Sequence, residues 1–241
     1  MNTDCILNIM NYLEYDDIDN YPDDIVRKHK KLRISHQDIG TIMDAIRYSE
    51  YSKITYCIYS YDTIAILNIL DHIRVLSLRA NNISLIPISL INLTTLDCSY
   101  TMVTTLPSEF VNLTMLNISH TQINEIPDTF TKLNTLVCYS SNITSLSENY
   151  INLENLYCSD TKITKISEKY TNLVNLYCYC THISYIPPSL INLVELYCYN
   201  TQISEIPSSL IKLEKLHCNN TLVTVIPNFT RLTNFNEYIL K

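Results

Sequence analysis

The chain repeats itself every twenty residues over most of its length, and this period restricts the folds open to it. One leucine column keeps the period without a slip: Leu76, Leu96, Leu116, Leu136, Leu156, Leu176, Leu196 and Leu216. Aliphatic residues follow each leucine by seven and ten positions, as Ile123 and Ile126 follow Leu116. A unit this short cannot bury its apolar side alone, so successive units must stack into one continuous core.

The order of residues within a unit predicts one strand and one turn. Around Leu96 the inward and outward positions alternate, which is typical of a short strand. In most units a proline follows the second aliphatic residue, as Pro107 follows Leu106, and turns the chain back. Stacked units would therefore pair their strands in parallel, as a sheet on the concave face of an arc.

The unit Leu-x-x-Leu-x-Cys-x-x-Thr-x-Ile-x-x-Ile-Pro resembles the leucine-rich-repeat motif, with Cys for a core leucine and Thr for the usual asparagine. The resemblance implies an α/β solenoid: a leucine-rich-repeat arc with a parallel concave β-sheet and a small helical N-terminal cap or F-box-like segment. In that family the asparagine bonds to turn backbone of neighbouring units. A hydroxyl can satisfy only part of that network, because it has fewer donors and a shorter reach.

Four segments follow from this periodicity. Residues 1–50 form a helical N-terminal segment, 51–73 a degenerate first repeat, 74–232 eight leucine-rich repeats, and 233–241 a C-terminal cap. The last unit is one residue short, and we expect Phe229, Leu232 and Phe235 to cover the open end of the stack.

Six of the nine cysteines share one inward-facing repeat position, where other units carry Leu78 or Ile118. They are Cys98, Cys138, Cys158, Cys178, Cys198 and Cys218. Exchange with leucine and isoleucine is typical of a small buried hydrophobe. Parallel thiols cannot wrap a metal tetrahedrally, and Cys178-Tyr-Cys180 lacks the turn of a zinc knuckle, so we expect no metal and no cofactor. No histidine shows an evident partnership with a cysteine, which disfavours a catalytic thiol.

Composition excludes several classes of function. A single glycine, Gly40, leaves no Gly-rich phosphate loop or nucleophile elbow. The net charge of −7 disfavours nucleic acid as a partner, and no apolar run is long enough to span a membrane. The N-terminus lacks the basic region of a signal peptide, so we expect an intracellular protein, in the cytoplasm of the cell or of a host. We also expect a monomer. Richness in Ile, Asn, Tyr and Lys is typical of A+T-rich genomes such as those of giant DNA viruses or amoebae.

Strand residues that flank the buried leucine and cysteine would point from the concave face to solvent. Counting each unit from Leu76 as one rung, six tyrosines cluster on rungs four to seven, and His217 borders them. These are the predicted partner-binding residues: Tyr139, Tyr157, Tyr177, Tyr179, Tyr197, Tyr199 and His217. Tyrosine is enriched at binding hot spots, but it also favours strands, where adjacent rings could simply stabilise the sheet. Asp160, Glu195 and Lys215 border this patch, and Arg79, Asp97, Asn117 and His120 make the early rungs more polar.

The N-terminal segment carries an amphipathic pattern followed by the acidic pair Asp16-Asp17. Residues 4–18 resemble the first helix and turn of an F-box, a module that often precedes leucine-rich repeats. The resemblance implies that a Skp-family adaptor would bind Ile6, Leu7, Ile9, Met10, Leu13 and Ile18. Asn2 stands where the F-box has proline, and the chain has no tryptophan for the later part of the pattern. A plain helical cap is the alternative, and a second helix is expected around 36–49.

Three functions follow for a chain of this kind. The first is a protein–protein interaction module that binds a protein on its concave face. The second is an F-box-type substrate-recruiting adaptor of a cullin ubiquitin ligase. The third is a ubiquitin-ligase enzyme like the bacterial ones that carry similar repeats, but only nine residues follow Leu232, too few for a catalytic domain. We therefore expect a protein that is not an enzyme.

Overall fold

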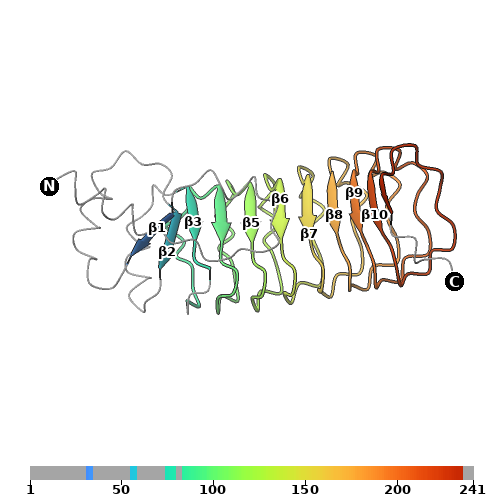
Figure 1. Ribbon diagram of the computed structural model, residues 1–241. Helices are drawn as coiled ribbons and strands as arrows, with labels where there is room; N and C mark the ends of the chain where they lie inside the picture. Colours follow the sequence, from blue (N-terminus) through green and yellow to red (C-terminus); the bar gives the residue numbers. More distant parts are fainter. Residues whose placement is uncertain (1–30, 35–54, 59–73, 80–82, 236–241) are drawn as a thin grey trace.

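The computed structural model describes residues 31–34, 55–58, 74–79 and 83–235 (Figure 1). Two strands near the N-terminus, β1 (Lys31–Ile34) and β2 (Thr55–Ile58), pair in parallel. The main sheet has nine parallel strands in chain order. They are β3 (Val75–Ser77), β4 (Thr95–Asp97), β5 (Met115–Asn117), β6 (Thr135–Val137), β7 (Asn155–Tyr157), β8 (Asn175–Tyr177), β9 (Glu195–Tyr197), β10 (Lys215–His217) and β11 (Asn234–Phe235).

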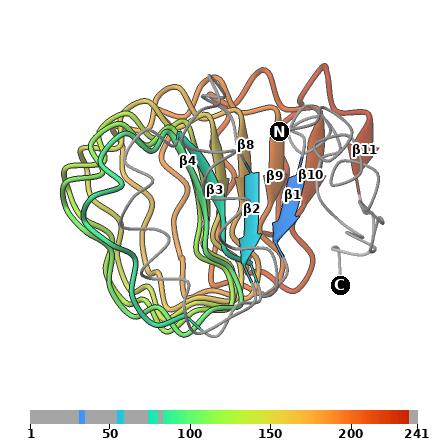
Figure 2. The same cartoon turned by 90° about the vertical axis from the view of Figure 1, so that its left-hand side faces the viewer.

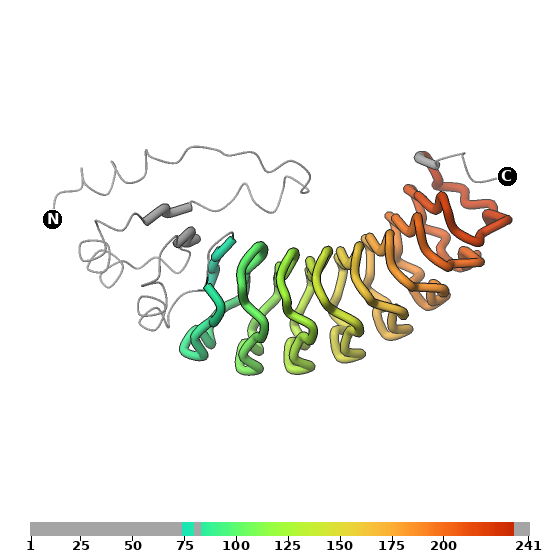
Figure 3. Tube along the Cα trace, turned by 90° about the horizontal axis from the view of Figure 1, so that it is seen from below, coloured from blue at the N-terminus to red at the C-terminus, as the bar shows by residue number. Residues whose placement is uncertain are grey.

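The strands stack in the register that the repeat predicts. Each pairs with residues twenty positions on, so Leu156 lies opposite Leu176 and Tyr157 opposite Tyr177. The last pairing is nineteen positions apart, Lys215 with Asn234, because the final unit is one residue short. Figure 3 shows the resulting arc, and Figure 2 shows the strands gathered on one side of it. The prediction of a solenoid with a parallel sheet is confirmed.

The leucine and cysteine columns lie in the core, which runs through all eight rungs. A further buried column was not singled out from the sequence: Leu90, Phe110, Phe130, Tyr150, Tyr170, Leu190 and Leu210. Its two tyrosines keep their hydroxyls satisfied, because Tyr150 donates to the carbonyl of Ile126 at 2.9 Å and Tyr170 to that of Ser147 at 2.7 Å. Buried hydroxyls need such partners, so the column accepts tyrosine as well as phenylalanine.

No helix occurs in residues 74–79 and 83–235. Away from the sheet the chain passes through two consecutive turns in each rung, as when Phe110 N–H donates to Pro107 O and Leu113 N–H to Phe110 O. Twenty residues leave room for a short strand and turns only. The helices of the expected α/β class were predicted for the N-terminal segment, and they lie outside the described residues. The one part of that segment that the structure describes, Lys31–Ile34, is a strand.

Each end of the solenoid carries a short strand beyond the eight repeats. Within residues 233–241, which were expected to cap the stack, Asn234–Phe235 continue the sheet as its ninth strand. Phe229 and Leu232 are partly buried against the core, as a covering role requires. At the other end, β2 falls within the segment expected to be a degenerate repeat and contacts β3.

A left-handed residue follows each strand from β4 to β10, and none of these residues is glycine. They are Tyr100, His120, Ser140, Asp160, Cys180, Asn200 and Asn220, with φ between 51 and 57°. The next residue fixes the turn: Thr101 Oγ1 donates to Cys98 O at 2.6 Å and accepts from Val103 N–H at 3.4 Å. The hydroxyl thus serves the turn of its own rung, which agrees with the partial network expected of it.

Candidate binding surface on the concave face

The cysteine column is part of the core and not of the surface, as the sequence predicted. All six thiols are buried, and Cys98 Sγ lies 3.6 Å from the carbonyl oxygen of Asn117. Burial raises the pKa of Cys158 to about 12 and that of Cys178 well above its ordinary value. Neutral thiols are poor nucleophiles and poor metal ligands, so this column contributes packing.

Four aromatic rings stack along the third position of strands β7 to β10. Successive ring centroids lie 4.9 Å apart for Tyr157 and Tyr177, 4.3 Å for Tyr177 and Tyr197, and 4.4 Å for Tyr197 and His217. All four side chains are only half-buried, so the ring edges remain open to solvent. We call Tyr157, Tyr177, Tyr197 and His217 the tyrosine stack. Parallel strands place equivalent residues one above another, which is why the rings meet.

A carboxylate anchors this stack. Glu195 accepts hydrogen bonds from the Tyr177 hydroxyl and from Lys215 Nζ, both at 2.6 Å. Burial works against the charge of Glu195, but the hydrogen bonds from Lys215 and Tyr177 outweigh it and lower the pKa of the carboxyl. Burial, together with that same bond, raises the pKa of Tyr177 far above its ordinary value. Tyr177 therefore remains a neutral donor with a fixed orientation.

Amide side chains extend the polar ladder toward earlier rungs. Asn175 Nδ2 donates to Asn155 Oδ1 at 2.7 Å, and Asn155 Nδ2 donates to Thr135 Oγ1 at 3.3 Å. These residues occupy the first position of their strands, beside the tyrosine stack. The concave face of rungs four to eight therefore combines a column of rings with a column of hydrogen-bonding groups.

A second aromatic group lies on rungs one to four. The guanidinium carbon of Arg79 lies 5.3 Å from the centre of the Tyr100 ring, which stacks on His120 at 4.2 Å. His120 in turn meets Tyr139 edge-on at 5.1 Å. We call Arg79, Tyr100, His120 and Tyr139 the mixed row. Tyr100 was missed from the sequence because it follows the strand in the left-handed turn, where a side chain is not expected on the sheet face.

The structure brings the predicted partner-binding residues together on one face. Besides the tyrosine stack, Tyr179 and Tyr199 stack at 4.4 Å with ring planes 6° apart, while Tyr139 joins the mixed row. The predicted adaptor-binding residues Ile6, Leu7, Ile9, Met10, Leu13 and Ile18 lie outside the described residues. Among the residues that the structure does describe, no cluster could hold a metal ion and no helix is long and apolar enough to cross a membrane.

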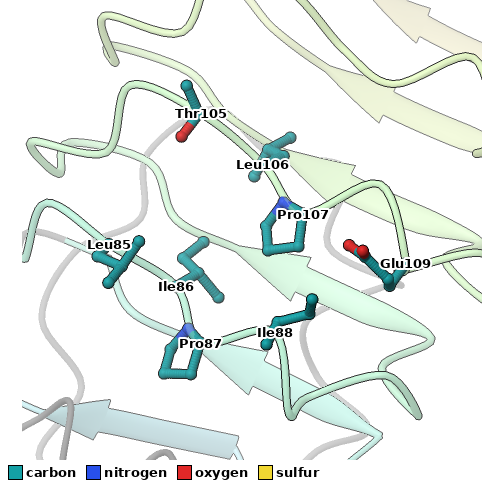
Figure 4. Close-up of a pocket in the computed structure, with 8 residues that line it drawn as sticks. All are labelled: Leu85, Ile86, Pro87, Ile88, Thr105, Leu106, Pro107 and Glu109. Atoms are coloured by element: carbon teal, nitrogen blue, oxygen red, sulfur yellow. The ribbon is translucent and has the colours of Figure 1, made fainter.

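An apolar recess lies elsewhere, between the turns of the first two rungs (Figure 4). It is lined by Leu85, Ile86, Pro87, Ile88, Thr105, Leu106, Pro107 and Glu109. Leu85 and Ile88 are more than half exposed, so the recess is shallow and open. With Glu109 as its one charged group, it offers little to orient a polar ligand.

Comparison with known proteins agrees with the fold. The family model described as Leucine Rich Repeat matches residues 112–133. No curated protein sequence matches the chain closely enough to indicate a relative. The chain nevertheless has the leucine-rich-repeat fold, as its repeat and its similarity to solved structures of that fold show.

Three solved structures illustrate the similarity. An internalin, InlF, from Listeria monocytogenes aligns with a TM-score of 0.70 at 19% identity, over 82% of this chain and 69% of its own. The functional domain of InlJ from the same organism, which includes a cysteine ladder, aligns at 0.64 and 25% identity over 73% of this chain and 41% of its own. YopM from Yersinia enterocolitica aligns at 0.57 and 21% identity over 68% and 37%. The chain thus spans less than half the length of the last two.

Proposed function

Since the chain is a leucine-rich-repeat solenoid, we propose that it is a protein–protein interaction module that binds its partner on the concave face of rungs four to eight. The observation that carries the proposal is the tyrosine stack, whose rings are held in place by one another and by Glu195. Rings that are ordered in advance lose little conformational entropy when a partner binds. Partly exposed tyrosine edges offer both apolar area and polar tips.

The same stacking also stabilises the sheet, so the two roles must be separated by substitution. Replacing Tyr157 and Tyr197 by phenylalanine keeps the ring contacts and removes the hydroxyl tips. If the rings serve the sheet alone, these variants bind a partner as the parent does. If the tips take part in recognition, binding weakens while the free energy of unfolding changes little.

Affinity capture from cells of the source organism, followed by binding measurements with the purified partner, tests the proposal. We expect Tyr177→Ala combined with Tyr197→Ala to weaken binding at least about tenfold, as hot-spot residues do. Tyr185→Ala is the matched control, because Tyr185 is an equally large ring, 55% exposed, in the irregular segment outside the sheet. Unchanged binding by a folded double variant would contradict the proposal.

The F-box-type adaptor of a cullin ubiquitin ligase is the second candidate. Its support is the resemblance of residues 4–18, and it adds a Skp-family adaptor to the partner held by the repeats. Full-length chain should then recover the adaptor, residues 50–241 should not, and Leu13→Asp should abolish recovery. Recovery with both chains, or with neither, would rule the adaptor role out.

The proposal involves binding without catalysis, in an intracellular compartment. The buried thiols with raised pKa values are consistent with a core that stays reduced there. A viral or amoebal source belongs to the same proposal, because it rests on composition alone. Microscopy of the tagged chain in its native cell, together with a labelling assay for cell-surface proteins, tests the compartment.

A further inference from the structure

Planar side chains form a row along the edge where the strands end, and rung five interrupts it. The mixed row runs from Arg79 to Tyr139, and the stacked pair Tyr179 and Tyr199 continues on rungs six and seven. Rung five has Ser159 and Asp160 at these positions. The interruption therefore separates two groups of rings on the same face.

The register sets the width of this interruption. Strands β6, β7 and β8 pair in order, so Tyr139 and Tyr179 are two strand spacings apart, roughly 9.6 Å. Rings on adjacent rungs of this face have their centroids 4.2 to 5.1 Å apart, and the most nearly parallel pairs lie at 4.3 to 4.4 Å. Two spacings thus match one planar group placed between two rings. Tyr179 lies nearly parallel to Tyr199, so its other face turns toward rung five.

Rung five also holds an unsatisfied hydroxyl. In the same column, Ser99 Oγ donates to Asp97 Oδ1 at 2.7 Å and Ser119 Oγ to Asn117 Oδ1 at 2.8 Å. On rung five the residue two positions earlier is Tyr157, whose ring carries no such carbonyl or carboxylate oxygen. Among the described residues the buried Ser159 hydroxyl consequently has no hydrogen-bond partner. A buried group of this kind gains from any donor or acceptor brought to it.

The charge beside this hydroxyl is negative. Asp160 is exposed and accepts a hydrogen bond from Ser140 Oγ at 2.7 Å, which leaves carboxylate lone pairs for further donors. Its backbone is fixed, because Asp160 N–H donates to Tyr179 O at 3.0 Å. A ring face, a carboxylate and a hydroxyl are therefore held on adjacent rungs.

We propose that rung five is a recognition site for an arginine side chain of the partner protein. The guanidinium stacks on the open face of Tyr179, pairs with Asp160 and donates to Ser159. Asp160 is accessible in the structure, whereas Ser159 is only 2% exposed, so its hydroxyl must be uncovered before the guanidinium can reach it. The proposal rests on the proposed function, since it names a feature of the protein bound on the concave face.

Arginine fits better than the other planar or cationic side chains. A neutral aromatic ring brings no charge to Asp160, and the lysine ammonium has no plane to stack on Tyr179. Guanidinium is planar, cationic and carries five donors. The chain itself contains the same contact, because Arg79 lies over the Tyr100 ring at the N-terminal end of the row.

The test uses a random peptide library displayed against the immobilised full chain. We expect peptides with arginine at one fixed position to be enriched. Made as synthetic peptides, they should bind the parent chain at least about tenfold more weakly once their arginine is replaced by lysine. The unchanged peptides should bind the Asp160→Asn variant, and the Ser159→Tyr variant in which a ring fills rung five, more weakly by a similar factor. Asp128→Asn is the matched control, since it removes an exposed carboxylate on the turn side of the solenoid, and should bind as the parent does.

Each other outcome has a defined meaning. In one outcome, the peptides fail to bind the Tyr177→Ala, Tyr197→Ala double variant and yet bind the Ser159→Tyr variant as tightly as the parent chain. That result overturns the arginine site and leaves the concave-face proposal standing. Enriched peptides in which lysine or tyrosine replaces arginine without loss also overturn it. Both proposals fail if no peptide is enriched. They also fail if the enriched peptides bind the rung-five variants and the Tyr177→Ala, Tyr197→Ala double variant as tightly as the parent chain.

Discussion

The tyrosine stack and the mixed row show how one repeat architecture produces two different surfaces. In the stack, rungs five to eight present aromatic residues at the same strand position, and the rings lie within 35° of parallel. In the mixed row the side chains come from different positions of their rungs, and they meet stacked, edge-on and as a cation over a ring. A column of equivalent rings therefore gives a regular stacked surface. A row of different side chains gives a surface that combines a guanidinium, an imidazole and two phenol rings.

The largest expected effect is a loss of stability on removing a core leucine. It tests whether the core is equally well packed beneath the tyrosine stack and beneath the mixed row. Leu176 lies under the stack and Leu116 under the mixed row, and both are fully buried. Replacing either by alanine should lower the free energy of unfolding by about 3 kcal/mol, since each leaves a cavity of the same kind. Urea unfolding of the two variants and the parent chain measures this loss of free energy. A difference of more than about 1 kcal/mol between the variants would show that the core is not uniform.

A smaller effect is expected for coupling between rings. A double-mutant cycle on Tyr177 and Tyr197 should give about 1 kcal/mol, because these rings are almost parallel at 4.3 Å. The cycle on His120 and Tyr139, whose rings meet edge-on at 5.1 Å, should give less. Equal coupling energies would contradict the distinction between the two surfaces.

The left-handed residues allow a sharper comparison. Cys180→Gly should raise the free energy of unfolding by roughly 0.5 kcal/mol, because relief of the left-handed strain exceeds the entropy that glycine costs. Tyr100→Gly relieves the same strain but loses contacts with His120 and Arg79, so we expect no gain. Thermal or urea unfolding of the two variants separates them. A gain for Tyr100→Gly that matches Cys180→Gly would mean that the mixed row adds no stability.

The smallest effect concerns pH. Burial lowers the pKa of His120 below its usual 6.5, so the unfolded chain binds this proton more readily. The stabilising contribution is complete above pH 6.5 and is lost as the pH falls toward the folded pKa. A titration followed by NMR should give a midpoint below 6.5, and His120→Gln should remove that part of the pH dependence. A midpoint above 6.5 would contradict the role of burial.

The fold could be predicted from the sequence because its main signal is periodic. Leu96 and its equivalents determined the strand register, and the exchange of cysteine with leucine showed that the thiols were buried. The column from Leu90 to Leu210 was harder to see, since it alternates among leucine, phenylalanine and tyrosine. What unites these residues is a turn position, which a hydrophobic pattern alone does not reveal.

The site was predicted less completely. Tyrosines at alternate strand positions had to share a face, but whether their rings would stack depends on side-chain angles that a pattern does not encode. Tyr100 reaches the face from a left-handed turn, and a tyrosine in the sequence does not predict a left-handed backbone. The unpartnered hydroxyl of Ser159 became visible only beside Ser99 and Ser119, whose partners are known from the structure.

The buried cysteine column makes the opening of individual rungs measurable. Six rungs each hold one thiol shielded from solvent, whereas Cys180 is exposed. A thiol reagent should modify Cys180 at once and reach each of the others only when its own rung opens. The order in which these cysteines react would therefore record whether the stack opens from its ends inward or all together.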